Sequence, residues 1–394
     1  MKNRTRLNLL EIRGVSLILC SMLFIGSIPL SVTAQSTKHR LTFRDWCAER
    51  NTLYPNARHT VEVLLEEAQT QNCKLAEERL MSSRSLMLLS STIEDLAPLT
   101  SLTNLERISL YYSNFDANFL TSFSLGNVSP LASLTNLEAL VSLTNLKSLT
   151  LSNVNIEDIS PLASLTNLES LTLSNSNIED ISFLSSLTDL ESLSLRNSNI
   201  DDLSLVGSLT HLESLNLSEN NIEDVTPLIN LTNLVSLDLS QNDIEDLTPL
   251  ASLSSLKELR LYHNDIEDLT PLVSLENLER LFLYNNEIEN VTPLASLNNL
   301  RELWLYNNDI EDVTPLASLS DLEALALSNN EIEDVTPLAA LSDLEKLWLE
   351  GNEVEDASSL SVLSNLTLLD LARNPIFSQI CPVRPESICQ WNSP

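Results

Sequence analysis

The side chains best suited to recognition chemistry in this 394-residue chain are aromatic and basic residues between positions 260 and 348. Tyrosine, tryptophan and arginine dominate protein interfaces, because they bury much area while few torsions become fixed. Their chemistry is noncovalent binding of a partner. The candidate partner-binding residues are Arg260, Tyr262, His263, Arg280, Phe282, Tyr284, Trp304, Tyr306, Lys346 and Trp348.

The residues that enzymes use show no catalytic pattern. The sequence holds no G-x-S-x-G motif and no phosphate-binding loop, and carboxylate pairs recur in most repeats instead of marking one site. We therefore expect no enzymatic activity, no catalytic residue, no cofactor and no metal ligand set. The scattered histidines are His39, His59, His211 and His263.

A repeat of 22 residues sets the positions of the candidate side chains. Leucine recurs at this interval from Leu143 to Leu363, in units of the form L-x-x-L-x-x-L-x-L-x-x-N-x-I-x-D-V-T-P-L. Leu303 and Leu305 flank a single residue, which indicates a short strand with one face in the core. Stacked units predict a parallel sheet on one side and 3₁₀ turns on the other, because too few residues remain for a full helix.

Units of this length and form, over roughly residues 80–374, resemble the bacterial internalin type of leucine-rich repeat. The predicted fold class is an α/β solenoid, a leucine-rich-repeat arc with a concave parallel β-sheet and convex 3₁₀ or short turns. A helical N-terminal cap and a disulfide-closed C-terminal cap are expected to cover its ends. The resemblance implies that the concave C-terminal half holds another protein.

Inward-facing positions change character along the predicted arc. Units beginning at Leu143 through Leu231 carry mostly small polar residues there, whereas units from Leu253 onward carry the candidate residues. Phe282 and Trp304 occupy equivalent positions in adjacent units, as do the three candidate tyrosines, so we expect ladders about 5 Å apart. The polar half shows that the scaffold does not require aromatic residues, which favours binding. Stabilisation of the sheet by stacking is the alternative.

Three other columns are interpreted as structural. Asn308 and its equivalents are expected to satisfy backbone groups where each strand turns away. Thr314 is expected to cap the turn that begins at Pro315. The acidic pair Glu311 and Asp312 recurs in most units and is expected to be a solvated face, with calcium binding as the alternative.

The predicted segments are a signal peptide at 1–34, a helical cap at 35–79, repeats at 80–374 and a second cap at 375–394. The helical cap is predicted because apolar residues recur at helical spacing after Pro55, and a second helical segment follows near residues 73–80. The repeats are irregular at 115–142, where one unit is expected to carry an insertion and the next to be cut short.

The leader prediction rests on basic residues followed by an apolar run, Val15 to Leu30, and by a cleavage pattern ending at Ala34. A membrane anchor is the alternative, but the run is short for a span of roughly 20 residues. The chain carries a net charge of −33. Loss of a leader with four basic residues and one acid leaves −36, which argues against nucleic acid and anionic membranes as partners.

Four cysteines remain after cleavage, an even number that suggests disulfides in an exported chain. Two lie near each end, which favours Cys47 with Cys73 and Cys381 with Cys389. A zinc site is the alternative, although no CxxC or HxxxH spacing is present.

These observations predict a secreted or extracytoplasmic protein, in a periplasm or at a cell surface, that binds a protein ligand and does not insert into a membrane after cleavage. Two alternatives stay open. One is a carbohydrate or cell-wall binder that uses the aromatic ladder, and the other is a structural surface protein bridged by cations at its acidic column.

Overall fold

The structure is a computed structural model. All described residues belong to the second of two compact units, Arg40–Pro394, and the leader predicted at 1–34 lies outside them and stays a prediction. The structure describes residues 42–89, 93–111, 132–134, 137–156, 158–178, 180–377 and 379–391.

Helices precede the repeats. The two predicted helical segments are present as α2 (Pro55–Glu67) and α3 (Cys73–Ser82), whereas the helix α1 (Phe43–Ala48) was not predicted. Its signal is the capping box of Thr42 and Asp45, whose side chains each accept a hydrogen bond from the other's backbone N–H at 3.2 Å. A disulfide joins Cys47 on α1 to Cys73 on α3. The bounds are α1 (Phe43–Ala48), 3₁₀-helix η1 (Arg50–Thr52), α2 (Pro55–Glu67) and α3 (Cys73–Ser82).

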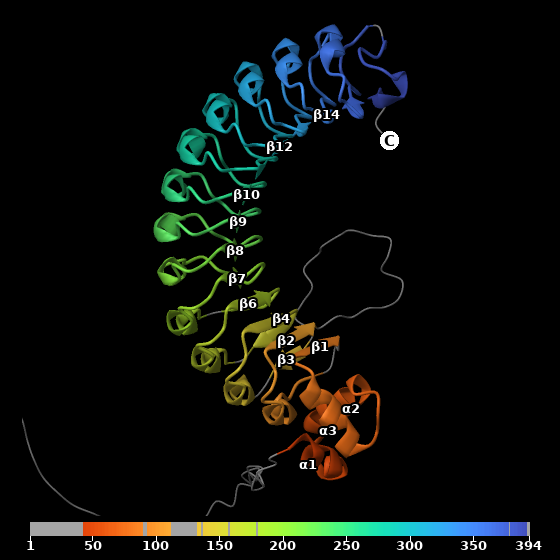
Figure 1. The fold of residues 1–394 in the computed structure, drawn as a ribbon. Coiled ribbons are helices and arrows are strands. Elements are labelled where there is room, and N and C mark those ends of the chain that lie inside the picture. Colours follow the sequence, from red (N-terminus) through yellow and green to blue (C-terminus); the bar gives the residue numbers. More distant parts are fainter. Residues whose placement is uncertain are drawn as a thin grey trace, which may run out of the picture. The chain divides into compact units, whose positions relative to one another are not determined.

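One parallel sheet runs through the repeats. Among the described residues it holds fourteen strands, which line the concave side of the unit in chain order (Figure 1). This arrangement confirms the predicted fold class. The strands are β1 (Ser85–Leu89), β2 (Arg107–Tyr111), β4 (Ser148–Ser152), β6 (Ser170–Ser174), β7 (Ser192–Ser194), β8 (Ser214–Asn216), β9 (Ser236–Asp238), β10 (Glu258–Arg260), β11 (Arg280–Phe282), β12 (Glu302–Trp304), β13 (Ala324–Ala326), β14 (Lys346–Trp348), β15 (Leu368–Asp370) and β16 (Cys389–Gln390).

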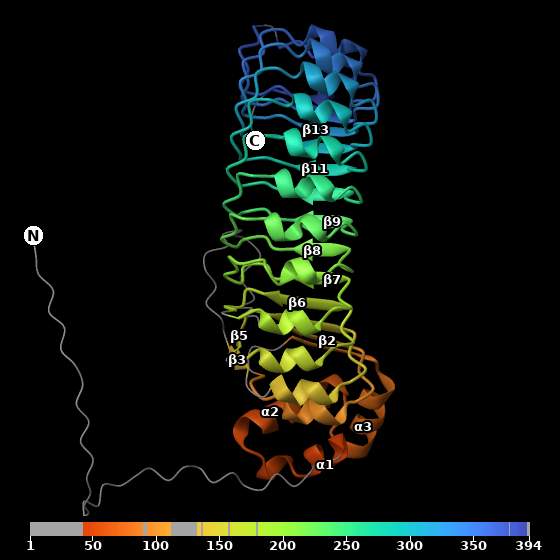
Figure 2. The same ribbon diagram turned by 90° about the vertical axis from the view of Figure 1, so that its left-hand side faces the viewer.

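Short 3₁₀-helices form the opposite, convex side and stack along the unit (Figure 2). Most begin at the Thr-Pro or Ser-Pro of a repeat, where proline suits the first helical position. They are η2 (Ala97–Ser101), η4 (Leu137–Ser142), η5 (Ser160–Ser164), η6 (Ser182–Ser186), η7 (Val206–Ser208), η8 (Thr226–Asn230), η9 (Thr248–Ser252), η10 (Thr270–Ser274), η11 (Thr292–Ser296), η12 (Thr314–Ser318), η13 (Thr336–Ala340) and η14 (Ser358–Val362). A further 3₁₀-helix, η15 (Glu386–Ile388), precedes the last strand of the sheet.

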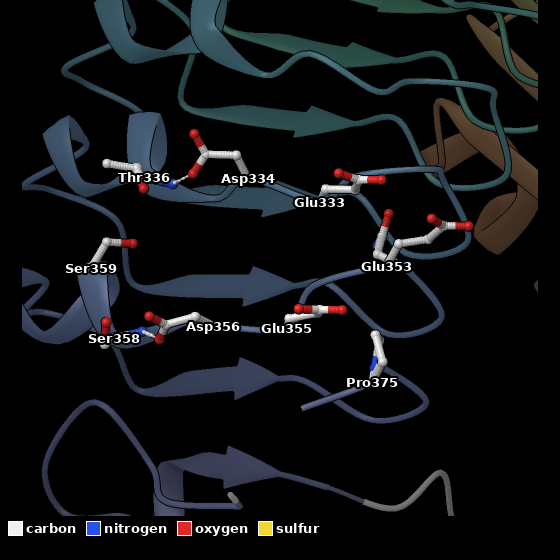
Figure 3. A pocket seen from close by; sticks show the side chains of 10 residues that line it. Glu333, Asp334, Thr336, Glu353, Glu355, Asp356, Ser358, Ser359 and Pro375 are labelled. Atoms are coloured by element: carbon white, nitrogen blue, oxygen red, sulfur yellow. Dashed lines mark hydrogen bonds between the residues drawn. The ribbon is translucent and has the colours of Figure 1, made fainter. Parts of the chain in front are cut away.

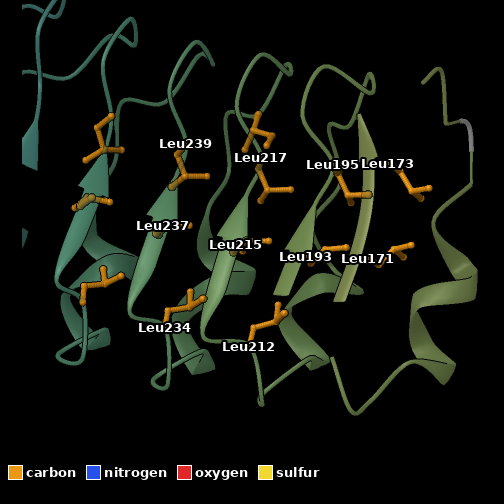
Figure 4. Packing of buried hydrophobic residues seen from close by; sticks show 14 of the residues in the cluster. Leu171, Leu173, Leu193, Leu195, Leu212, Leu215, Leu217, Leu234, Leu237 and Leu239 are labelled. Atoms are coloured by element: carbon orange, nitrogen blue, oxygen red, sulfur yellow. The ribbon is translucent and has the colours of Figure 1, made fainter. Parts of the chain in front are cut away.

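Leucine rows fill the space between sheet and turns. Leu193, Leu215 and Leu237 form one row and Leu195 and Leu217 belong to the next, all buried (Figure 4). Each strand places its leucine directly beside that of its neighbour. The alternation within a strand therefore sends the intervening residues to the concave surface.

The asparagine column has the predicted structural role. The buried Asn308 amide donates to the carbonyls of Leu283, at 3.1 Å, and Leu305, at 3.0 Å. Its oxygen accepts from the Ile288 N–H at 3.1 Å. Each asparagine thus ties its own repeat to the preceding one, and the column as a whole supplies partners to buried backbone groups.

The predicted threonine cap is wrong. The 3₁₀-helix at Thr314 has no side-chain hydrogen bond from its capping residue Val313. Instead, Asp312 Oδ1 accepts from the Thr314 N–H at 2.8 Å. An aspartate can reach the N–H two residues ahead in an Asx turn, so the acidic residue starts the turn and the threonine donates to it.

Across the irregular segment, two strands that are far apart in the sequence are direct neighbours in the sheet. Strand β2 pairs directly with β4, so that Ile108 lies beside Leu149. Strand β3 (Ala132–Leu134) pairs instead with β5 (Val154–Ile156) in a separate two-stranded sheet. The prediction of two units, one lengthened and one shortened, is therefore corrected to one unit with a long insertion, whose residues 112–131 lie outside those described.

At the other end, β16 pairs with β15, and a disulfide joins Cys381 to Cys389. The pairing covers the last repeat, as a solenoid end requires. No helix in the described part of the chain has the length and apolar character to cross a membrane.

Candidate partner-binding surface

The repeat brings all ten candidate residues to strands β10, β11, β12 and β14 or to the one to three positions that follow them. None enters the leucine core. Their side chains are half-buried or exposed. His263 lies in the turn after its strand, with a φ of 54°, and the other nine occupy the positions opposite to the buried leucines. Six of them form what we call the aromatic surface: Tyr262, Phe282, Tyr284, Trp304, Tyr306 and Trp348.

Three tyrosines form the first row of the aromatic surface. The Tyr262 and Tyr284 rings stack at 4.4 Å between centroids and 7° between planes. Tyr284 and Tyr306 stack at 4.2 Å and 11°. Both faces of the Tyr284 ring are thus covered, and burial raises the pKa of the Tyr284 and Tyr306 hydroxyls. The row therefore leaves no free face on its central ring, Tyr284.

The second row reaches further than the sequence indicates. Phe282 and Trp304 lie 5.9 Å apart between centroids, with planes tilted by 43°. Trp304 also contacts Trp348, two strands away, at 5.9 Å and 38°. Between them lies Ala326, which is only 5% exposed. Because the side chain of Ala326 is small, the Trp304 and Trp348 indoles can contact each other across strand β13. In the sequence, this contact is indicated by an alanine between two tryptophans at equivalent positions of successive repeats.

The two rows touch, since the Trp304 and Tyr306 rings lie edge to face at 6.2 Å between centroids. The Trp304 Nε1 is buried, with no hydrogen-bond partner among the described residues. His263 borders the tyrosine row, with its ring edge-on to Tyr262 and Tyr284 at 5.9 Å. One continuous surface results.

Beside the aromatic surface, Arg260 and Arg280 form ion pairs with the same carboxylate, Glu258, which was not predicted from the sequence. The Glu258 side chain is 8% exposed and forms ion pairs with both Arg260 and Arg280. The Arg260 guanidinium carbon also lies 5.3 Å from the centroid of the Phe282 ring. In the sequence, Glu258 stands out because each of the five preceding repeats has a serine at the equivalent position. Lys346, by contrast, is exposed at the first position of β14.

The preceding half of the sheet offers a different surface. Serine and threonine are in register across β4 and β6, as with Thr150 beside Thr172 and Ser152 beside Ser174. These side chains carry hydroxyl groups and little apolar area. The concave side therefore has a polar half, β4 to β9, and an aromatic half, β10 to β14.

A separate hollow of about 660 Å³ lies among the carboxylates of the loops, away from the aromatic surface. Glu333, Glu353 and Glu355 surround it, together with Asp334 and Asp356 (Figure 3). Both aspartates accept a backbone N–H from the turn that follows, at 2.8 Å. Within the described ranges, no group of three or more histidine, cysteine or acidic residues is placed to hold a metal ion.

Comparisons with known proteins agree with this architecture. A family model for leucine-rich repeats (2 copies) matches residues 144–186, 166–209, 210–252, 254–296 and 298–340. No curated protein matches the chain in sequence.

Solved structures give the family. An internalin (InlF) from Listeria monocytogenes is 34% identical, with 84% of this chain and 92% of that chain covered and a TM-score of 0.72. The functional domain of InlJ from the same species is 20% identical (84% and 66% covered, TM-score 0.55). The plant peptide hormone receptor RGFR1, solved in complex with RGF2, is 18% identical (73% and 53% covered, TM-score 0.55). Identity and coverage with InlF together place this chain in the internalin family of bacterial leucine-rich-repeat proteins.

Proposed function

We propose that the chain is a non-enzymatic, exported binding protein that holds another protein on its aromatic surface. One observation carries the proposal: six aromatic side chains gather in mutual contact on the concave side. The polar half shows that the sheet forms equally well with serine and threonine at the same positions. Rigid aromatic side chains of this kind dominate binding energy at interfaces.

The relatives and the cysteines support the proposal. Leucine-rich-repeat proteins act in general as interaction scaffolds, and the plant receptor was solved with a peptide hormone bound. Disulfides Cys47–Cys73 and Cys381–Cys389 suit an oxidising, extracytoplasmic location. The predicted signal peptide agrees with export.

The geometry favours a protein over a carbohydrate partner. A sugar stacks on a free ring face, but Tyr262 and Tyr306 cover both faces of Tyr284. Trp304 has the tilted rings of Phe282 and Trp348 as neighbours. Ring edges and hydroxyls suit the mixed apolar and polar contacts of a protein interface. The cation-bridged alternative is disfavoured, because the aspartates of the acidic column hold the turns.

Photo-crosslinking capture from the native surroundings tests the proposal, with a glycan array measured in parallel. We expect the wild type to capture a protein that Phe282→Ala/Trp304→Ala/Tyr306→Ala does not capture. The matched control replaces the equivalent positions of the polar half, Thr150→Ala/Thr172→Ala/Ser174→Ala, and should capture normally. Equal capture by all three proteins would refute the proposal, and glycan binding lost only in the first variant would replace the protein with a carbohydrate partner.

A further inference from the structure

The shared carboxylate of the aromatic half is unusual for this sheet. Glu258 is nearly buried, yet the five preceding strands carry a serine at its position. Burial of a carboxylate is unfavourable unless it is paired. Because the scaffold accepts serine there, the sheet itself does not need the carboxylate. What Glu258 does in the structure is fix two guanidinium groups.

The pair has a defined geometry. Arg280 lies directly beside Glu258 on the next strand, about 5 Å away, and bonds its Oε2, while Arg260 bonds its Oε1. The Nη2 atom of each guanidinium makes the contact. A guanidinium has five N–H donors, and the Arg260 and Arg280 side chains are 36% and 51% exposed. Further donors of both groups are therefore open to a ligand on the concave side.

The arginines are also restrained before any ligand arrives. Glu258 holds both, and the Phe282 ring supports Arg260 from a second direction. Binding by side chains that are already fixed loses less conformational entropy. A guanidinium pair of this kind matches a carboxylate, which can accept from both groups at once.

Neighbouring charges limit the range of this attraction. Asp238 and Glu302 lie in register beside Arg260 and Arg280, respectively. Asp238 accepts hydrogen bonds from the Ser240 hydroxyl at 2.6 Å and from the Asn216 amide at 3.3 Å. The whole chain is strongly acidic. The pair therefore suits a single carboxylate that other contacts bring into place, and not a polyanion.

We propose that Arg260 and Arg280, held by Glu258, receive one aspartate or glutamate carboxylate of the protein partner beside the aromatic surface. The inference rests on the proposed function, because the aromatic contacts position that carboxylate. It adds the chemistry of the partner: an acidic side chain next to apolar residues.

Selection of phage-displayed random peptides on the full chain tests the inference. We expect the wild type to enrich peptides that combine apolar residues with an aspartate or glutamate. A synthetic copy of an enriched peptide should lose about tenfold or more in affinity when its acid is replaced by the amide. That loss should disappear on Glu258→Ser/Arg260→Ser/Arg280→Ser, which restores residue types of the polar half.

Arg196→Gln is the matched control, because Arg196 is an ion-paired arginine on the polar half. It should leave the acid preference unchanged. Enrichment of peptides without acids, or an equal acid-to-amide loss on wild type and triple serine variant, would overturn the inference while the proposed function stands. No enrichment over Phe282→Ala/Trp304→Ala/Tyr306→Ala would count against the proposed function and the inference together.

Discussion

Strands β4 to β9 and strands β10 to β14 are built alike and present different surfaces. Leu215 and Leu281 are equally buried, and asparagines Asn242 and Asn308 donate to equivalent carbonyls in both halves. Only the concave positions differ, with hydroxyls in one half and aromatic rings in the other. The repeat thus separates residues that build the sheet from residues that form its concave surface, where we propose binding.

Truncation of a buried leucine should lower the free energy of unfolding equally in the two halves, and this is the largest expected effect. Leu215→Ala and Leu281→Ala should each lower the free energy of unfolding by about 2–5 kcal/mol, because each leaves a cavity in the same leucine array. Chemical denaturation followed by circular dichroism measures the loss. A much larger loss in the aromatic half would show that its rings contribute to the stability of the core.

Surface truncation should separate the halves. Trp304→Ala is expected to weaken binding of the captured protein by about 2 kcal/mol or more, since a central aromatic residue is removed. Thr172→Ala in the polar half should leave the affinity unchanged. Isothermal titration measures both affinities, and equal losses would mean that the partner covers the whole sheet.

Removal of an asparagine amide should also destabilise the two halves equally. Asn242→Ala and Asn308→Ala each remove one of the two asparagine donors of two leucine carbonyls and leave one backbone N–H without its acceptor. We expect a loss of about 1–3 kcal/mol in unfolding free energy for each variant. Urea denaturation measures the pair, and an effect confined to one half would contradict a uniform scaffold.

The fold was predictable because a fixed repeat converts spacing into position. Leu303 and Leu305 defined the strand, and the ladder of Tyr284 followed from its equivalents one unit away. The contact of Trp304 with Trp348 was not predictable in this way, because it depends on side-chain rotamers across two strands. The Glu258 ion pairs were missed for a related reason. A charged residue in a column of serines marks the position, but the ion pairs that Glu258 forms depend on side-chain rotamers.

The turn aspartates give the smallest expected effect, and it depends on pH. Hydrogen bonds from the hydroxyl and the N–H of Thr314 hold the pKa of Asp312 below its ordinary value of 3.8, and Thr226 does the same for Asp224 in the polar half. A pKa lowered by folding adds stability above the ordinary value, and that stability is lost as the pH falls through the folded value. Asp312→Asn and Asp224→Asn should keep the acceptor, as Asn290 does naturally for the Thr292 N–H at 2.9 Å.

Each variant should therefore be slightly less stable than the wild type at pH 7, and the difference should shrink towards pH 3, because the carboxyl of the unfolded chain becomes protonated below its ordinary pKa of 3.8. Urea denaturation at both pH values measures it. A difference that stays constant with pH would mean that the charge of the aspartate plays no part in the turn. A difference seen in one half alone would show that the surface a half presents affects even the opposite side of its repeats.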